Sequence, residues 1–289
     1  MPSPSPRSAL PAAASALTVA VVRGPVREAV VLGEHRLGLY LDVDGSVLPV
    51  VPSDAVALPT ALRLGARSSA LADGPLPWGV AAGDRILVGG GRVELPVGDV
   101  VAVRTWRPAR VRRVAAGASC PGSREAVAAL LLEASVGCDP WLAPATAAVL
   151  SRLPGPAGLD QLVGRGRGLT PSGDDALAGA LLVAHALRVS RPLVAAVRDR
   201  LGTTTAVSAA LLAAATDGFA ARPVVALVDA VVLGHVDATA RALPEVVALG
   251  HTSGRDLVTG VLEALRTHVP VPVRQTTTQT STPTGRSAA

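Results

Sequence analysis

The residues best suited to chemistry lie in one stretch, 164–179, which reads GRGRGLTPSGDDALAG. Gly164, Gly166 and Gly168 can adopt positive φ and let a ligand approach the main chain closely, because glycine has no side chain. A helix that begins near Ser172 would offer free amide groups and the positive end of its dipole to an anion. The stretch is therefore predicted to be an anion- or metal-binding turn that opens a buried helix.

Hydroxyl and carboxylate side chains complete this turn. Thr170 and Ser172 add hydroxyl donors, and Ser172 with Asp175 has the spacing of a capping box. The adjacent Asp174 and Asp175 would repel a bare anion, so a Mg²⁺ ion held by both is one interpretation, with a phosphorylated substrate bridged through it. A second is that one aspartate acts as a general base or as a hydrogen-bond acceptor for an amide substrate. A third is that both only favour the helix dipole.

Two later segments place small and hydroxyl residues at predicted helix starts. Threonines at 203–205 precede a helix that contains Ser208, and residues 250–256 read GHTSGRD. Such residues cap helices, but three starts of this kind in one domain also suggest convergence on a single pocket. His251 is the candidate proton shuttle, since the ordinary histidine pKa lies nearest neutrality, and a capping or packed histidine is the alternative.

The chain contains no lysine, which excludes two kinds of site. A pyridoxal phosphate Schiff base needs a lysine amine, and a Walker-type nucleotide loop needs a lysine beside the phosphates. The 27 basic residues are all arginine, and the formal net charge is +5. Because most arginines are spread along the chain and aromatic residues make up only 2%, we expect no nucleic-acid partner. DNA binding through the arginines of 104–113 is a further alternative.

Composition also bounds the class of protein. Hydrophobic residues make up 49% of the chain and charged residues 17%, which is typical of a folded protein. No apolar run reaches the ~20 residues that would span a bilayer, so we expect no membrane partner. Cys120 and Cys138 are too few for a disulfide scaffold and lack the spacing of zinc ligands. They are interpreted as reduced apolar residues of a cytoplasmic protein.

Short valine-rich runs, separated by Gly, Pro and Asp turn signals, dominate the first part of the chain. Asp44-Gly45 is typical of a tight hairpin turn, and glycines at 89–91 are predicted to join two later strands. Strands are expected at 17–22, 29–32, 37–41, 46–51, 85–88, 93–95 and 100–106. We therefore predict a small β barrel or sandwich over residues 15–117, after a disordered lead-in at 1–14.

The second part of the chain has the pattern of helices, several of them apolar nearly all round, as in helices packed within a bundle. Helices are expected at 123–135, 141–153, 175–189, 192–200, 204–216, 223–233, 238–249 and 254–268. The predicted fold class is α+β. A mostly α-helical C-terminal domain over residues 118–270 would carry the site, and residues 271–289 would form a disordered tail.

Three segments resemble one known family. GLTPSGDD at 168–175, the TT-x-x-S pattern at 204–208 and GHTSGRDLVTG at 250–260 are similar to the AllH-type family. Its members include a subunit of bacterial oxamate carbamoyltransferase, and many are known only as a domain of unknown function. The resemblance extends from about Leu162 to Leu265, and GLTPSGDD is its most specific motif. Arg165 and Arg167 depart from the family pattern, which has less basic residues around these glycines.

The resemblance implies a carbamoyltransferase-type enzyme of allantoin (purine) catabolism. The chain would be a subunit that binds carbamoyl phosphate or a similar small anion together with companion carbamoyltransferase subunits. The alternative is a non-catalytic accessory or metabolite-sensing subunit that uses the same pocket. Asp174, Asp175 and His251 would be catalytic, and the two aspartates are also the candidate metal ligands. The candidate substrate-binding residues are Gly166, Gly168, Thr170, Ser172, Gly173, Thr204, Ser208, Thr252, Ser253, Gly254 and Asp256.

Overall fold

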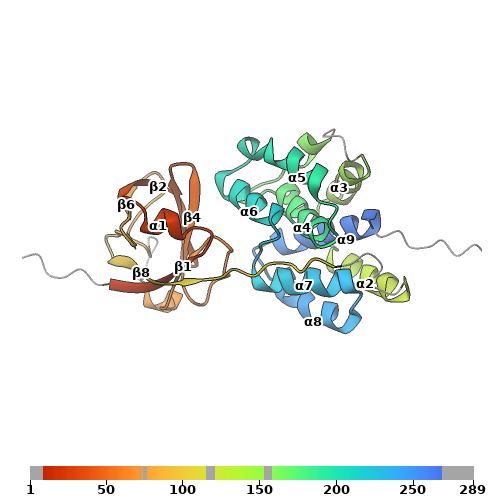
Figure 1. Ribbon diagram of the computed structural model, residues 1–289, viewed down its shortest axis with the longest axis horizontal. Helices are drawn as coiled ribbons and strands as arrows, with labels where there is room; N and C mark the ends of the chain where they lie inside the picture. Colours follow the sequence, from red (N-terminus) through yellow and green to blue (C-terminus); the bar gives the residue numbers. More distant parts are fainter. Residues whose placement is uncertain (1–8, 72, 74–76, 115–120, 153–157, 269–289) are drawn as a thin grey trace, which may run out of the picture.

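The computed structural model describes residues 9–71, 73, 77–114, 121–152 and 158–268. Figure 1 shows two lobes side by side, a β barrel built from the first part of the chain and a lobe of helices built from the rest. The fold is α+β, as the sequence predicts. The predicted tail at 271–289 and the first eight residues lie outside the described part of the chain.

A closed barrel forms the first lobe, with the strand order β1-β5-β4-β3-β2-β6-β7-β8. It closes where β1 runs parallel to β8, and the remaining pairs are antiparallel except β4 with β5. Closure leaves no unpaired strand edge, which a flat sheet of this size would expose. The strands are β1 (Ala9–Ser15), β2 (Arg27–His35), β3 (Gly38–Val43), β4 (Ser46–Val51), β5 (Leu62–Leu64), β6 (Arg85–Gly89), β7 (Arg92–Val93) and β8 (Asp99–Trp106).

The hairpin between β3 and β4 turns at Asp44-Gly45, as predicted. Both residues have positive φ, 52° and 79°, which the tight two-residue turn requires and which aspartate and glycine tolerate. Gly89 is needed for a different reason. Its φ is 139°, and a Cβ there would lie 2.3 Å from the Pro25 carbonyl oxygen. Only glycine therefore lets the β6–β7 turn pack against the end of the short helix α1 (Val19–Arg23).

Two expectations about the start of the chain are wrong. Residues 9–14, predicted as part of a disordered lead-in, form most of β1, which pairs with both β5 and β8. Residues 17–22, predicted as a strand, form a turn and most of α1. The reason is tertiary, since Ala12–Ala14 are buried in the barrel while Leu17 is 41% exposed. Small alanines carry little strand signal of their own, and the neighbouring strands decide the pairing.

The second lobe contains the predicted helices, with ends that differ by a few residues. Its helices are α2 (Pro121–Ala134), α3 (Leu142–Ser151), α4 (Ser172–Ala186), α5 (Arg191–Arg198), α6 (Ala206–Thr216), α7 (Arg222–Leu233), α8 (Val236–Val247) and α9 (Ser253–His268). Nearly every residue of α4 is buried, which confirms the prediction of a helix inside a bundle. None of the helices in the described part of the chain is both long and apolar enough to cross a membrane.

An extended segment, residues 107–114, leads from β8 along the helical lobe (Figure 1). Arg110 donates from Nε to the Asp217 carbonyl at 2.8 Å, and its guanidinium lies over the Phe219 ring. Arg112 pairs with Asp229 at 3.0 Å, and its backbone amide donates to the same carboxylate. These two arginines of the basic stretch therefore fasten the segment to the helices.

Candidate functional site

The glycine-rich turn is packed tightly on its own backbone. Gly164, Gly166 and Gly168 all have positive φ, as predicted, at 71°, 129° and 88°. A Cβ on Gly166 would lie 2.4 Å from the Ser172 nitrogen, and a Cβ on Gly173 would lie 2.0 Å from the Leu162 carbonyl oxygen. Gly166 and Gly173 are therefore required for close contacts within the turn itself. A Cβ on Gly168 would face open space, so only the positive φ explains why glycine occupies this position.

The capping box predicted for Ser172 and Asp175 is absent. Helix α4 begins at Ser172, Pro171 occupies the N-cap position, and no side chain caps the helix there. The Pro171 carbonyl accepts the amides of Asp174 and Asp175 at 2.9 and 3.1 Å. Since Ser172 is already inside the helix, its hydroxyl is not placed to cap, and the Asp175 side chain is left to face the pocket described below.

Asp174 is a structural residue, with both carboxylate oxygens engaged. Oδ1 accepts the Gly164 amide at 2.9 Å, and Oδ2 accepts a short hydrogen bond from the Thr204 hydroxyl. The side chain is almost fully buried. It thus joins the glycine-rich turn, the start of α4 and the segment before α6. Thr204, a predicted binding residue, serves this contact.

Asp175, the next residue, is also buried but lacks a full set of hydrogen-bond partners. It is 9% exposed, and its Oδ2 makes no hydrogen bond in the structure. Burial raises the pKa of Asp175 to about 8, and the charges of Asp256 and Asp174 act in the same direction. The hydroxyls of Ser253 and Thr170 partly oppose this rise in pKa. At neutral pH the carboxyl is therefore mostly protonated, so it can both donate and accept a hydrogen bond.

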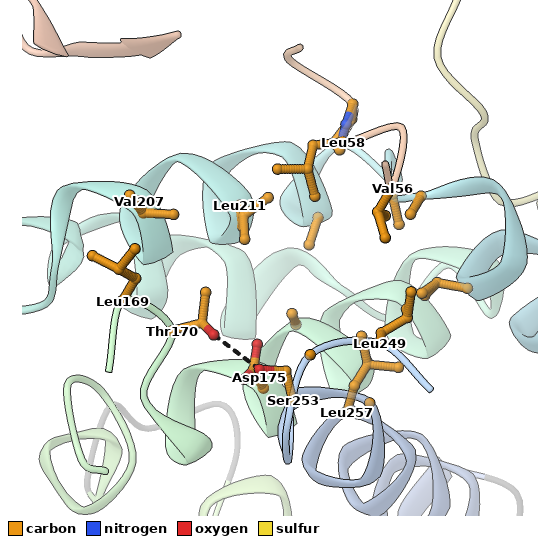
Figure 2. A pocket seen from close by; sticks show the side chains of 18 of the residues that line it. Val56, Leu58, Leu169, Thr170, Asp175, Val207, Leu211, Leu249, Ser253 and Leu257 are labelled. Carbon is orange, nitrogen blue, oxygen red and sulfur yellow. Dashed lines mark hydrogen bonds between the residues drawn. The ribbon is translucent and has the colours of Figure 1, made fainter. Parts of the chain in front are cut away.

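The start of α9 lies beside Asp175, as Figure 2 shows. The Thr170 hydroxyl and the Ser253 hydroxyl are 3.0 Å apart, which links the glycine-rich turn to α9. Asp256, one turn further along α9, is 1% exposed and also has an Oδ2 without a hydrogen-bond partner. All three predicted helix starts therefore meet at one place. Thr170, Asp175 and Ser253 lie together, and the Thr205 hydroxyl, at the start of α6, donates to the Leu169 carbonyl at 2.5 Å.

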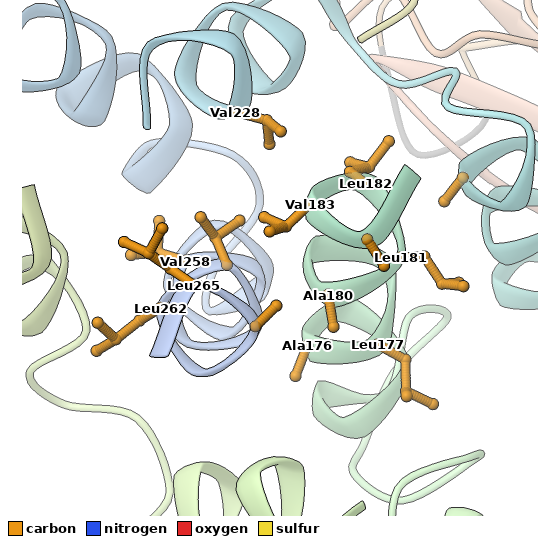
Figure 3. Packing of buried hydrophobic residues seen from close by; sticks show 14 of the residues in the cluster. Ala176, Leu177, Ala180, Leu181, Leu182, Val183, Val228, Val258, Leu262 and Leu265 are labelled. Carbon is orange, nitrogen blue, oxygen red and sulfur yellow. The ribbon is translucent and has the colours of Figure 1, made fainter. Parts of the chain in front are cut away.

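Close packing of α4 against α9 holds this arrangement (Figure 3). A Cβ on Gly179 would lie 2.2 Å from the Leu257 carbonyl oxygen, and a Cβ on Gly260 would lie 1.8 Å from the Ala176 carbonyl oxygen. The two backbones can approach this closely only because each helix has a glycine at the contact. Gly254, a predicted binding residue, has a similar role, since its Cβ would lie 2.0 Å from the Val246 carbonyl oxygen.

The other predicted site residues lie elsewhere. His251 and Thr252 are exposed and do not line the pocket, so the structure does not bring His251 to the carboxyl groups. Ser208 is buried in α6, and its amide is capped by the Thr205 hydroxyl at 3.1 Å. The guanidinium of Arg165 lies over the Trp141 ring, 4.1 Å from its centroid.

A cavity of about 350 Å³ opens beside Asp175, between the helical lobe and the barrel. Thr170, Asp175 and Ser253 supply polar groups from the helical side, and most of the wall is aliphatic. Within the described part of the chain, no arginine lines this pocket. An anion placed there would consequently lack a charged partner from the pocket wall.

The donor set does not fit the predicted magnesium ion. Asp174 directs both oxygens to Gly164 and Thr204, which leaves Asp175 without the second ligand that the prediction requires. Across the described residues, no three His, Cys, Asp or Glu side chains gather in a way that could hold a metal ion. We therefore derive no chemical step through a metal.

The barrel side of the pocket could not be predicted from the sequence. His35 and Tyr40 lie on either side of the β2–β3 turn, and Val56 and Leu58 lie in the segment after β4. The indole of Trp78 donates to the His35 carbonyl at 2.8 Å and steadies that turn. These residues have the pattern of ordinary loop and strand residues, so only the docking of the two lobes shows that they face Asp175.

These features define a two-lobed protein with a buried acid at a pocket between a barrel and a helical bundle. Residues 162–265 match the family model of the oxamate carbamoyltransferase subunit AllH, which confirms the resemblance drawn from the motifs. The matched segment begins before the glycine-rich turn and ends within α9, so it includes Thr170, Asp175 and Ser253. No solved structure matches the chain.

Proposed function

We propose that this chain is a subunit of an oxamate carbamoyltransferase-like enzyme of allantoin catabolism, and that its pocket holds the primary amide used in this chemistry. The observation that carries the proposal is the Asp175 carboxyl, since the residue lines the pocket and its Oδ2 is buried without a hydrogen-bond partner. A buried polar atom without a partner is unfavourable by about 1–3 kcal/mol, which a ligand that supplies the missing hydrogen bond would recover.

A primary amide is complementary to a protonated carboxyl group. The carboxyl donates from its hydroxyl and accepts at its carbonyl, while the amide accepts at oxygen and donates from nitrogen. The raised pKa of Asp175, about 8, keeps the donating form populated at neutral pH. The hydroxyls of Thr170 and Ser253 add further donors and acceptors beside it. Oxamate and carbamoyl phosphate both carry a primary amide.

The same carboxyl is suited to the proton transfer of the reaction. In carbamoyl transfer, the oxamate nitrogen attacks the carbamoyl carbon, a C–N bond forms, and the C–O bond to phosphate breaks. Phosphate leaves with that electron pair, and the nitrogen loses a proton. The ionised form of Asp175, which is the minor form at neutral pH, would hold the amide by accepting its N–H and would then take this proton. A general base works best when its pKa lies near the working pH, because both forms are then populated. The expectation that Asp174 shares this role is not supported by its fully engaged oxygens.

The anionic ends of both substrates need groups from outside this pocket. Since no arginine lines the pocket in the described part of the chain, the phosphate and the oxamate carboxylate would be held elsewhere. Companion subunits are the natural source of such groups, which supports a role as one subunit among several. An accessory subunit that binds the amide without completing the active site remains the alternative, and activity with and without companions separates the two.

The test is steady-state carbamoyl transfer to oxamate, measured as phosphate release, first with the chain alone and then with companion subunits. We expect turnover with companions. Asp175→Leu should lower kcat/KM by at least about 100-fold, as expected for a lost base. Asp175→Asn should lower kcat but leave KM nearly unchanged, because an amide side chain still donates and accepts. Asp237→Asn, at an exposed acid of α8, is the control. Wild-type kcat/KM in the Asp175→Leu complex would overturn the proposal.

A further inference from the structure

The pocket contains much more apolar surface than a small polar substrate could use. Its volume of about 350 Å³ lies in the range of pockets that bind drug-sized organic ligands, roughly 300–1,000 Å³. Oxamate has only a few non-hydrogen atoms, and all but its carbons are polar. A chamber of this size and composition would therefore be poorly filled by oxamate alone.

The polar side chains of the helical wall lie together, and His35 and Tyr40 add polar groups from the barrel wall. Figure 2 shows Thr170, Asp175 and Ser253 together, where the glycine-rich turn meets the starts of α4 and α9. Across from them, α6 presents Val207 and Leu211. The pocket therefore has a polar head region on its helical side, and the rest is a chamber whose wall is mostly aliphatic.

The barrel closes the chamber. Val56 and Leu58, from the segment after β4, lie across the opening from Leu249 and Leu257 of the helical lobe (Figure 2). Val56 is 40% exposed, although large apolar side chains are usually covered. The lobes also touch near the head region, since a Cβ on Gly33 of β2 would lie 3.9 Å from the Leu169 side chain. The barrel is thus part of the wall that a ligand would meet.

We propose that the ligand of this pocket is a carboxamide with an apolar body, whose amide head binds Asp175 and whose body is selected by Val56 and Leu58 of the barrel. The proposal rests on the amide-binding role of Asp175 proposed above. Burying a charged group against aliphatic walls without a partner is strongly unfavourable. A ligand whose amide continues into a neutral apolar body therefore fits this chamber better than one whose amide continues into a carboxylate. Oxamate would then be the smallest member of the substrate class.

The test is calorimetry of the full chain with straight-chain primary amides from acetamide to hexanamide, with oxamate and hexanoate as further ligands. Each added methylene should tighten binding about fourfold until the chamber is full. Hexanamide should bind more tightly than both oxamate and hexanoate. Leu211→Gln should flatten the dependence on chain length while acetamide binding stays unchanged. Leu132→Gln, at an exposed leucine of α2 away from the pocket, should leave the series as in the wild type.

The outcomes separate this inference from the proposed function. If the affinity does not change with chain length but is lost in Asp175→Leu, the ligand has no apolar body that the chamber selects, and this inference falls. The proposed binding of the amide by Asp175 would still hold. Tighter binding of hexanoate than of hexanamide would also overturn the inference, because it would require a charged head. If Asp175→Leu binds the whole series as tightly as the wild type, the amide head is wrong and both proposals fall.

Val56→Asp and Leu58→Asn test the barrel separately from the helices. Both positions lie in a segment outside the strands, so these changes leave the barrel sheet intact. Each substitution should weaken the binding of hexanamide by at least about tenfold, because it removes one apolar contact surface. The binding of acetamide should weaken much less. Equal weakening of both amides, or of neither, would show that the barrel does not select the body.

Discussion

Asp174 and Asp175 are chemically identical neighbours whose surroundings give them opposite roles. The region around Asp174 is saturated, since the Gly164 amide and the Thr204 hydroxyl engage both carboxylate oxygens. The region around Asp175 is a pocket wall, where one oxygen has no partner and burial raises the pKa to about 8. Successive residues of a helix point about 100° apart, so one carboxyl faces the turn and the other faces the pocket. A buried carboxyl group can bind a ligand or transfer a proton only where the protein leaves one of its oxygens without a hydrogen-bond partner.

Removing the saturated carboxyl should have the largest effect on stability. Asp174→Ala leaves the Gly164 amide and the Thr204 hydroxyl without their acceptor. Hydrogen bonds to charged groups contribute about 1.5–3 kcal/mol each, so the free energy of unfolding should fall by about 3–6 kcal/mol. Urea denaturation measures this change, with Asp237→Ala as an exposed control. A loss below about 1 kcal/mol would contradict the structural role of Asp174.

The pocket carboxyl should instead make stability depend on pH. The pKa of Asp175 is raised from 3.8 to about 8 in the folded chain, so between these values the folded chain holds a proton that the unfolded chain releases. The stabilisation is complete below the unfolded pKa and is lost as the pH rises through about 8. Relative to Asp175→Asn, the free energy of unfolding should fall by about 3.5 kcal/mol from pH 5 to pH 8.

Denaturation of both proteins at several pH values checks this dependence, and the difference between them removes the contribution of all other groups. The difference should level off above about pH 8. A difference that stays constant from pH 5 to pH 8, or that grows in the opposite direction, would show that Asp175 ionises normally in the folded chain.

The smallest expected effects on stability come from the hydroxyl groups at the starts of α6 and α4, because only the one at α6 caps its helix. Thr205→Ala removes the hydroxyl that caps the Ser208 amide at the start of α6, and should lower stability by about 1 kcal/mol. Ser172→Ala removes a hydroxyl that makes no cap at the start of α4, and should change stability by less than about 0.5 kcal/mol. The same denaturation assay applies. A larger loss for Ser172→Ala than for Thr205→Ala would restore the capping box that the sequence suggested.

Much of the fold could be predicted from local patterns. Helices α2 to α9 were found because apolar residues recur at the helical period and because Gly, Pro and hydroxyl residues mark their ends. The hairpin at Asp44-Gly45 was found because few residues tolerate positive φ at both positions. Strand β1 was missed because Ala12–Ala14 have weak strand propensity, and the pairing with β5 and β8 is distant in the sequence.

The candidate site was predictable in part. GLTPSGDD located Asp175 and Thr170, and GHTSGRDLVTG located Ser253, because helix starts rich in glycine and hydroxyl residues have a recognisable composition. His251 was chosen for its chemistry alone, and in the structure it is exposed and does not line the pocket, although Gly250 beside it does. No sequence pattern indicated that His35, Tyr40, Val56 and Leu58 of the barrel would face the site.

The sequence by itself determined which chemical groups this protein has and which local structures carry them. It excluded lysine chemistry, placed an acid pair at the start of a buried helix, and set the succession of strands and helices. Only the tertiary structure decided which acid is saturated, which one lines a pocket, and what the pocket wall is made of. Hydrogen-bond partners and burial come from residues distant in the chain, and these surroundings set the pKa and the availability of a carboxyl group.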